Sequence, residues 1–253
     1  MQNPPTRSEF AARYDQMVFS PQMRALYEGT DLYNVGDWSK GARTLPQACS
    51  DLVHRHIDGI SRPRSAAPHR ILDVGCGLGA TTELIARHFP GARVLGVNNS
   101  YAQLQYARAH HASAHYSVMD AAQLAVVGNS FDCILSVEAA FHFSPRVEFL
   151  RSAFRVLAPG GRIVLSDILF RSVEWTAGWS VPQANMLASI DNYRALCREL
   201  GFIQVEISDI TTETWRGFCE YLRAVEGQVA FADQLEEVVL AYVMVSLRKP
   251  TYL

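Results

Sequence analysis

Short apolar runs and amphipathic stretches alternate along most of the chain. Five apolar runs of strand length follow one another between residues 70 and 168, and they read RILDV, RVLGV, HYSVM, FDCILSV and RIVLSDI. Between them, polar and apolar residues recur at helical spacing, and two later runs, FIQVEISDI and YVMVSLRK, predict further strands. The alternation predicts an α/β fold with a doubly wound, mostly parallel seven-stranded sheet. In such a sheet the ligand site lies at the carboxyl ends of the strands.

The same pattern predicts one domain, 1–253, with four parts. Helical spacing broken by Pro and Gly marks the N-terminal part, and mixed character marks the stretch that follows the fifth strand. The expected parts are a helical N-terminal cap or lid at 1–65, the α/β core at 66–168, an insertion that covers the substrate site at 169–190, and the C-terminal part of the core at 191–253.

Charge and composition limit the kinds of partner that this protein is expected to bind. Of the 253 residues 49% are apolar, and the formal net charge is -2, which offers no general attraction to nucleic acid or to an anionic membrane. We find neither a signal peptide pattern nor 18 consecutive apolar residues, so a cytoplasmic protein is expected. The five cysteines are odd in number and never form C-x-x-C, which favours ordinary buried thiols over disulfides or a zinc site.

The chemistry is concentrated in the stretch ILDVGCGLGATTEL, from Ile71 to Leu84. Its three glycines follow a predicted strand and precede a predicted helix, where bare backbone and free N–H groups can approach a ligand. GCGLGA also satisfies the dinucleotide pattern G-x-G-x-x-A, so a nicotinamide-dependent oxidoreductase stays open. Against it, Asp73 would repel a pyrophosphate, and the second strand ends in NNS without the acid that binds a ribose.

Four motifs in order resemble the class I S-adenosylmethionine-dependent methyltransferases, and in particular the small-molecule, natural-product subgroup. They are LDVGCGLG, VMDAAQL, FDCILSVEAAFHF and RVLAPGGRIVLSD, and the resemblance runs from about Ile71 to Lys249. It implies a Rossmann-like fold with S-adenosyl-L-methionine as the cofactor. The family also implies that Asp73 lies near the amino group of the methionine part and that Asp120 lies against the adenine.

The resemblance assigns a set of cofactor-binding residues from the glycine loop, the next three strand ends and the N-terminal lid: Asp73, Gly75, Cys76, Gly77, Gly79, Asn98, Asn99, Met119, Asp120, Ala121, Glu138, Tyr14, Tyr33 and Trp38. Asn98 departs from the family, since most relatives carry Asp or Glu there, and an amide is the weaker acceptor for ribose hydroxyls. For the lid aromatics, a role as plain core residues stays open.

Catalytic candidates follow the fourth strand. If the segment SVEAAFHF is helical, Glu138 and His142 share a face at the catalytic end of the sheet. His142 is the preferred base because an unperturbed imidazole titrates near neutral pH, although a structural histidine is an equal alternative. Phe141, Trp175 and Trp179 are the expected substrate contacts. We find no carboxylate cluster in the sequence that indicates a metal.

The predicted reaction is methyl transfer to O, N or C of a small, aromatic or apolar metabolite in a closed pocket, as in secondary metabolite biosynthesis. The N-P-P-aromatic motif of nucleobase methyltransferases is absent after the fourth strand, which reads SVEAAF instead. A methyltransferase-like module that binds the cofactor without catalysis is the other alternative. The N-terminal segment is also a candidate surface for a homo-oligomer.

Overall fold

The computed structural model describes residues 7–61, 67–172, 181–224 and 228–252. Three helices precede the sheet: α1 Arg7–Val18, α2 Pro21–Leu26 and α3 Leu45–Ser61. The first half of the sheet then forms in the order β1 Arg70–Val74, α4 Ala80–His88, β2 Arg93–Asn98, α5 Tyr101–His110, β3 His115–Val118, η1 Ala121–Gln123, β4 Phe131–Ser136, η2 Ala140–His142 and α6 Arg146–Val156. The second half comprises β5 Leu157–Phe170, η4 Gln183–Asn185, α8 Ile190–Glu199, β6 Ile203–Asp209, η5 Thr212–Arg216, α9 Gly217–Ala224, α10 Val229–Val238 and β7 Val239–Arg248.

The strands form one seven-stranded sheet in the order β3-β2-β1-β4-β5-β7-β6. The five strands β1 to β5 run parallel, and β7 is antiparallel to both β5 and β6. The predicted α/β, doubly wound and mostly parallel sheet is therefore confirmed. Because the chain order reverses between the neighbouring strands β1 and β4, the carboxyl ends of these strands form the switch point at which ligands bind in such sheets.

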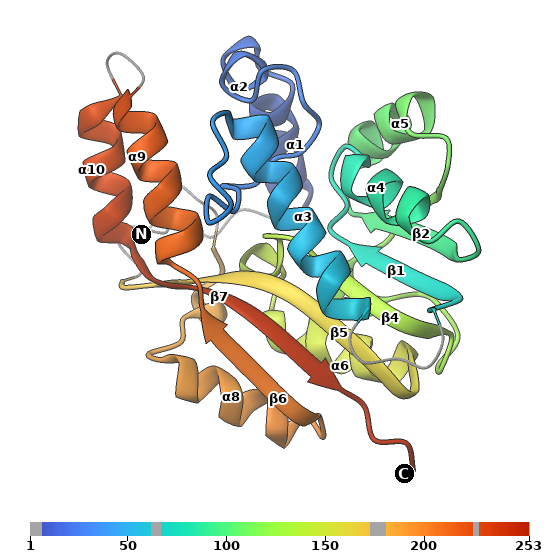
Figure 1. Ribbon diagram of the computed structural model, residues 1–253. Coiled ribbons are helices and arrows are strands. Elements are labelled where there is room, and N and C mark those ends of the chain that lie inside the picture. Colours follow the sequence, from blue (N-terminus) through green and yellow to red (C-terminus); the bar gives the residue numbers. More distant parts are fainter. Residues whose placement is uncertain (1–6, 62–66, 173–180, 225–227, 253) are drawn as a thin grey trace.

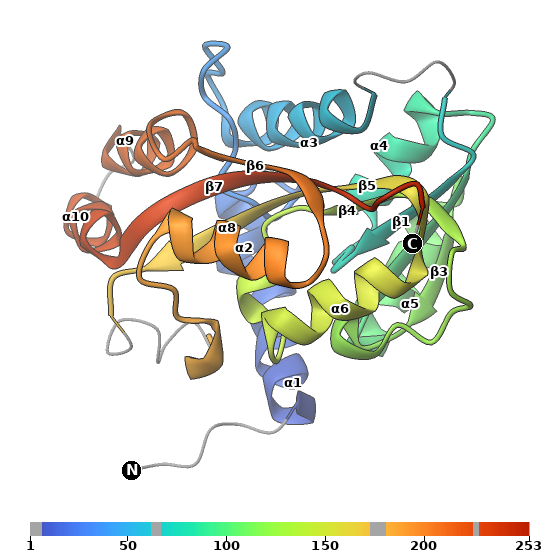
Figure 2. The same cartoon turned by 90° about the horizontal axis from the view of Figure 1, so that it is seen from below.

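Helices cover both faces of the sheet. Figure 2 shows α3 and α4 on one side and α6 and α8 on the other. Figure 1 shows α1 and α2 at the top of the view, above the sheet. No helix in the described ranges is long and apolar enough to span a bilayer.

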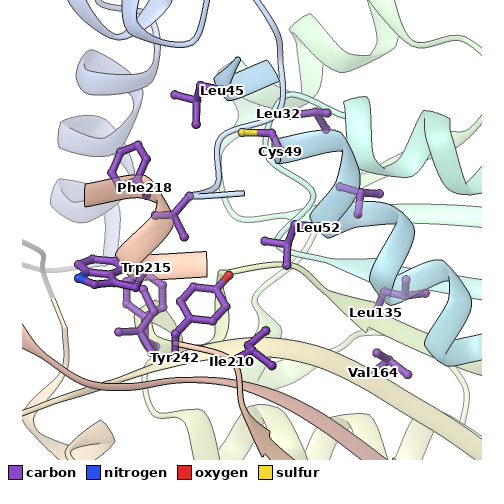
Figure 3. Close-up of a cluster of buried hydrophobic side chains, with 14 of the residues drawn as sticks. Leu32, Leu45, Cys49, Leu52, Leu135, Val164, Ile210, Trp215, Phe218 and Tyr242 are labelled. Atoms are coloured by element: carbon purple, nitrogen blue, oxygen red, sulfur yellow. The ribbon is translucent and has the colours of Figure 1, made fainter. Parts of the chain in front are cut away.

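One large apolar cluster joins the two ends of the chain. It lies on the α3 side of the sheet, where side chains of the N-terminal segment, α3 and the C-terminal elements pack together (Figure 3); its members include Leu32, Leu45, Cys49, Leu52, Leu135, Val164, Ile210, Trp215, Phe218 and Tyr242. Leu52 and Tyr242 are fully buried there. All five cysteines are buried free thiols, as the sequence predicts.

The fifth strand is longer than its apolar run indicates. The pattern predicts a strand over RIVLSDI after a PGG turn, whereas β5 runs from Leu157 to Phe170 and includes the turn. Leu157 pairs with Phe131 of β4, and the backbone N–H of Gly160 donates to the carbonyl of Lys249 at 3.1 Å. Partners far away in the chain thus extend the strand through residues that favour turns locally.

Candidate functional site

The glycine loop connects the end of β1 to α4. The backbone N–H groups of Gly75 and Cys76 both donate to the carbonyl of Val97 on β2, at 2.8 and 3.1 Å. Gly79 caps the N-terminus of α4 in a left-handed conformation and makes no side-chain cap bond. The loop is therefore fixed at the carboxyl edge of the sheet, with the N-terminus of a helix at its end.

The three glycines of this loop have different surroundings. A Cβ on Gly75 would lie 2.6 Å from the Cβ of Ala139, and a Cβ on Gly79 would lie 2.7 Å from the Cβ of Ala107. A Cβ on Gly77 would meet only the Oε1 of Gln103, at 3.8 Å. Close packing within the protein therefore explains Gly75 and Gly79. Gly77 is the position whose backbone has an open side.

Asp73 lies below the loop, on β1. Its side chain is 1% exposed, and its Oδ2 accepts a hydrogen bond of 2.6 Å from the hydroxyl of Thr82 on α4. Burial raises the pKa of Asp73 to about 7. One carboxyl oxygen thus connects the strand to the helix that begins after the loop.

At the end of β2, the side chain of Asn98 is bonded on both sides. Its Nδ2 donates to the Oε1 of Gln103 at 2.9 Å, and its Oδ1 accepts from the backbone N–H of Asn99 at 2.8 Å. The backbone carbonyl of Asn98 accepts from the N–H of Met119 at 3.0 Å. The ends of β2 and β3 therefore lie side by side.

Asp120 follows β3 and caps the short helix η1. Its Oδ1 accepts a hydrogen bond of 2.9 Å from the backbone N–H of Ala122. Ala121 is 8% exposed in the same turn. The structure thus brings the predicted adenine-side residues to the edge that also carries the glycine loop and Asn98.

An acid that the sequence analysis did not single out lies beside Asn98. Asp15, on α1, accepts from the hydroxyl of Ser100 at 2.9 Å and from the Nε2 of Gln103 at 2.6 Å. Gln103 in turn accepts from the amide of Asn98. The only local signal was its position in YDQM, directly after Tyr14.

Glu138 follows β4 with a left-handed backbone, at a φ of 51°. Its Oε2 accepts from the backbone N–H of Val35 at 2.9 Å and from the hydroxyl of Tyr242 at 2.8 Å. Its own N–H donates to the hydroxyl of Ser166 at 2.9 Å. Burial raises the pKa of Glu138 to about 7. The side chain therefore connects the lid segment around Val35 to β4 and β7.

His142 ends the 3-10 helix η2 and faces α1. Its ring lies edge-on to the ring of Tyr14, with 5.5 Å between the centroids. Burial and the nearby charge of Glu138 raise the pKa of Tyr14. The shared helical face expected for Glu138 and His142 does not form, because η2 begins only at Ala140 and the left-handed Glu138 lies outside it.

Of the other lid and substrate candidates, Phe141 contacts His142, whereas Tyr33 and Trp38 contact other segments. The hydroxyl of Tyr33 donates to the carbonyl of Val18 at 2.9 Å. The ring of Trp38 stacks on that of Tyr221 of α9, with 5.2 Å between the ring centroids. Phe141 is 3% exposed, and its ring centroid lies 4.0 Å from that of His142. Trp175 and Trp179 lie outside the described residues.

The turn that carries His142 also contacts the glycine loop. The Cζ of Phe143 lies 3.1 Å from the position of a Cβ on Gly75, so the His142 turn packs on the glycine loop. Within the described ranges, no group of three or more His, Cys, Asp or Glu side chains is arranged to hold a metal ion. The arrangement offers open backbone, a helix N-terminus and a histidine at one edge of the sheet.

Comparison with known proteins identifies relatives of the whole chain. A model of a methyltransferase domain matches residues 72–165. The methyltransferase GfsG of Streptomyces halstedii is 31% identical over 79% of this chain and 75% of its own length. The 27-O-demethylrifamycin SV methyltransferase of Amycolatopsis mediterranei is 30% identical over 97% of this chain and 98% of its own. Among solved structures, the [4+2]-cyclase SpnF has the same fold, with a TM-score of 0.76, 22% identity and 97% coverage of both chains.

Proposed function

Because the chain belongs to the class I S-adenosylmethionine-dependent methyltransferases of secondary-metabolite type, we propose that it methylates a hydroxyl group of a small, apolar or aromatic natural product, with His142 as the general base. The observation that carries this proposal is the packing of Phe143, the residue after His142, on the glycine loop at Gly75. A hydroxyl acceptor is favoured because the relative from Amycolatopsis is named for methylation at oxygen.

The residues present fit the cofactor of the family, S-adenosyl-L-methionine. Gly77 leaves its backbone open, and α4 begins directly after the loop with N–H groups that no side chain caps. The backbone of Gly75, Cys76 and Gly77 would hold the methionine part, and Asp120 would accept from the adenine amine. These are polar backbone and carboxylate groups of the kind that an amino acid and a nucleoside require.

Asn98 lacks the negative charge that most relatives carry at this position, but another carboxylate lies nearby. Asp15 brings a carboxylate to the same strand end, connected to Asn98 through Gln103. In our proposal the neutral amide contacts the ribose while Asp15 keeps Gln103 oriented. The carboxylate near this strand end thus comes from α1 and not from β2, and it acts on Gln103.

When bound, the cofactor supplies an electrophilic methyl group on a sulfonium, so the protein has to orient the acceptor and remove its proton. His142 takes the hydroxyl proton, and the edge of Tyr14 fixes the plane of its imidazole. The bond from Val35 to Glu138 holds the lid segment closed over the site. Closure excludes water, and such positioning can contribute about 7–11 kcal/mol to catalysis.

Apolar surroundings support the choice of acceptor class. Phe141 packs against His142 and, on its other side, against Phe170 of β5 with 5.6 Å between the ring centroids. Both rings are buried, so the interior next to His142 is apolar, as expected beside a site for an apolar acceptor.

The direct test is transfer of a labelled methyl group from S-adenosyl-L-methionine to a panel of hydroxylated macrolides and phenols. The test is needed because the fold also occurs in a protein described as a cyclase. Labelled product is expected, and binding of S-adenosyl-L-methionine without any transfer would favour the non-catalytic module. Heat stabilisation by NADH, and none by S-adenosyl-L-methionine, would favour the oxidoreductase.

The base assignment is tested by His142→Ala. Turnover is expected to fall by about 100-fold, because general base catalysis contributes at least that much, while cofactor affinity stays within about twofold. His110→Ala on the exposed end of α5 is the matched control. Equal turnover of His142→Ala and the native protein at every pH would refute the base role.

A further inference from the structure

A buried amide holds the backbone on both sides of His142. Asn185, at the end of η4, is 4% exposed. Its Nδ2 donates to the carbonyl of Phe141 at 2.9 Å and to the carbonyl of Phe143 at 2.6 Å. These two carbonyls belong to the residues directly before and after His142, so one side chain fixes the turn that carries the imidazole.

The orientation of this amide is set by Arg146, at the start of α6. The backbone N–H of Arg146 donates to the Oδ1 of Asn185 at 2.7 Å, and its Nη1 donates to the backbone carbonyl of Asn185 at 2.7 Å. Since an N–H must face Oδ1, the NH₂ group must face the two carbonyls. The amide therefore has all its groups satisfied in one orientation only.

Arg146 is itself locked in place by a buried ion pair. Its Nε lies 2.6 Å from the Oδ2 of Asp167, with side-chain exposures of 2% and 0%. The hydroxyl of Tyr193, on α8, donates to the same carboxylate oxygen at 2.9 Å. This buried ion pair is held rigidly, because removing either charge would leave the other unpaired in the interior.

We propose that Asn185 is a positioning residue for His142: its amide sets the height and orientation of the imidazole against Tyr14. The inference rests on the proposed function, in which His142 is the base. The side-chain amide of Asn185 donates to the backbone carbonyls of Phe141 and Phe143, so it acts on His142 through the backbone on either side. Asn185 itself belongs to the stretch 169–190 that is predicted to cover the substrate, and its two hydrogen bonds connect this part of the stretch to the turn that carries His142.

The sharpest test is Asn185→Asp. The carboxylate keeps an acceptor for the N–H of Arg146 but replaces the donor with an oxygen that faces two carbonyls. Turnover is expected to fall by about 10- to 100-fold, as for a displacement of a catalytic group by about 1 Å, with the KM for the cofactor within about twofold. Asn192→Asp, the same change at an exposed position of α8, is the control and should behave like the native protein. Asn185→Ser, which keeps a donor, should recover part of the loss and serves where the Asp variant does not fold.

Two readouts separate positioning from a merely structural role. In the double variant with His142→Ala, Asn185→Asp should add less than about twofold to the loss, because its effect passes through the imidazole. In protein with isotopically labelled histidine, the ring signal of His142 should change shift and titration midpoint in Asn185→Asp but not in Asn192→Asp.

Losses that multiply in the double variant, or a native His142 signal in Asn185→Asp, would overturn the inference. Failure of the base assignment would give a different experimental result. Unchanged turnover in His142→Ala would refute the base role, whereas the ring signal still reports whether Asn185 orients the imidazole. A shifted signal then supports the positioning role by itself.

Discussion

The glycines after β1 are required for two different physical reasons. Gly75 and Gly79 allow close packing, with Ala139 and Ala107 at distances that no Cβ tolerates, whereas Gly77 has open space on the side where a Cβ would stand. All three have a positive φ, so any other residue costs backbone strain at each. Sequence spacing cannot separate these roles, because the pattern G-x-G-x-G is the same for both.

We therefore expect Gly75→Ala and Gly77→Ala to fail in different ways. Both carry the left-handed strain of about 1–2 kcal/mol, but only Gly75→Ala adds a clash, with the Cβ of Ala139. Gly75→Ala should lower the melting temperature more. Gly77→Ala should keep most of the stability and bind S-adenosyl-L-methionine about tenfold more weakly. Calorimetric melting and titration of both variants measure this, and native affinity in Gly77→Ala would show that the loop does not face the cofactor.

Individual side chains of the site were predictable only where a motif carried them. The glycine loop, Asn98 and Asp120 were found from the sequence, and the structure brings them to one edge of the sheet. Asp15 and Asn185 were not. The partners of Asp15 lie 85 and 88 residues away along the chain, and a partner of Asn185 lies 44 residues away. Hydrogen bonds between such distant positions leave no periodic signal in one sequence.

Among the helices, α1 contacts the start of α5 through the carboxylate of Asp15. Asp15 accepts from Ser100 and Gln103, which both belong to the start of α5. Ser100 is at the same time the N-cap of α5, since its hydroxyl accepts from the N–H of Gln103 at 3.1 Å. The lid helix and the helix after β2 are thus joined by one charge-assisted network.

Asp15→Asn should loosen α1 while the sheet stays intact. The amide offers one acceptor in place of two, and a hydrogen bond to a charged group is worth about 1.5–3 kcal/mol. Hydrogen exchange of residues 7–26 should become faster, and exchange in β1 and β4 should not change. Asp58→Asn, at an exposed position of α3, is the control. Native exchange of α1 in Asp15→Asn would mean that apolar packing alone holds the lid.

The number of strands and their mostly parallel direction could be predicted better than the residues at which each strand begins and ends. Apolar runs gave seven strands and their mostly parallel order, because burial on both faces leaves a strong signal. The start of β5 was missed, since Pro159 and two glycines favour a turn locally while pairing with Phe131 and Lys249 continues the strand. The helical face expected after β4 was wrong for a related reason, namely that tertiary contacts of Glu138 hold it in a left-handed conformation.

In the described part of the chain, the N-terminal segment shares an apolar core with the C-terminal elements. Leu32 and Leu52 lie in the same apolar cluster as Trp215 and Tyr242 (Figure 3). The bond from Tyr242 to Glu138 connects this cluster to the site. We therefore expect the buried groups of the site to become solvated mainly when this shared core unfolds.

Two buried carboxyl groups should consequently make global stability depend on pH. Burial raises the pKa of Asp73 and that of Glu138 to about 7. The folded protein then retains protons on both groups up to near pH 7, while the unfolded chain loses them near pH 4. Because the folded state binds more protons between these values, its stability is greatest at the acidic end and falls as the pH rises to 7.

Asp73→Asn isolates one of these groups, because the amide oxygen can still accept from Thr82. Each unit of pKa difference corresponds to about 1.4 kcal/mol, so Asp73 should contribute a fall on the order of 3 kcal/mol in unfolding free energy from pH 5 to pH 8. Urea unfolding at several pH values should show a fall about half as large in Asp73→Asn, since Glu138 still titrates. The exposed Asp58→Asn should follow the native curve. Identical pH dependence in Asp73→Asn and the native protein would mean that Asp73 is ionised in the folded state, and that its charge is balanced by a group other than Thr82.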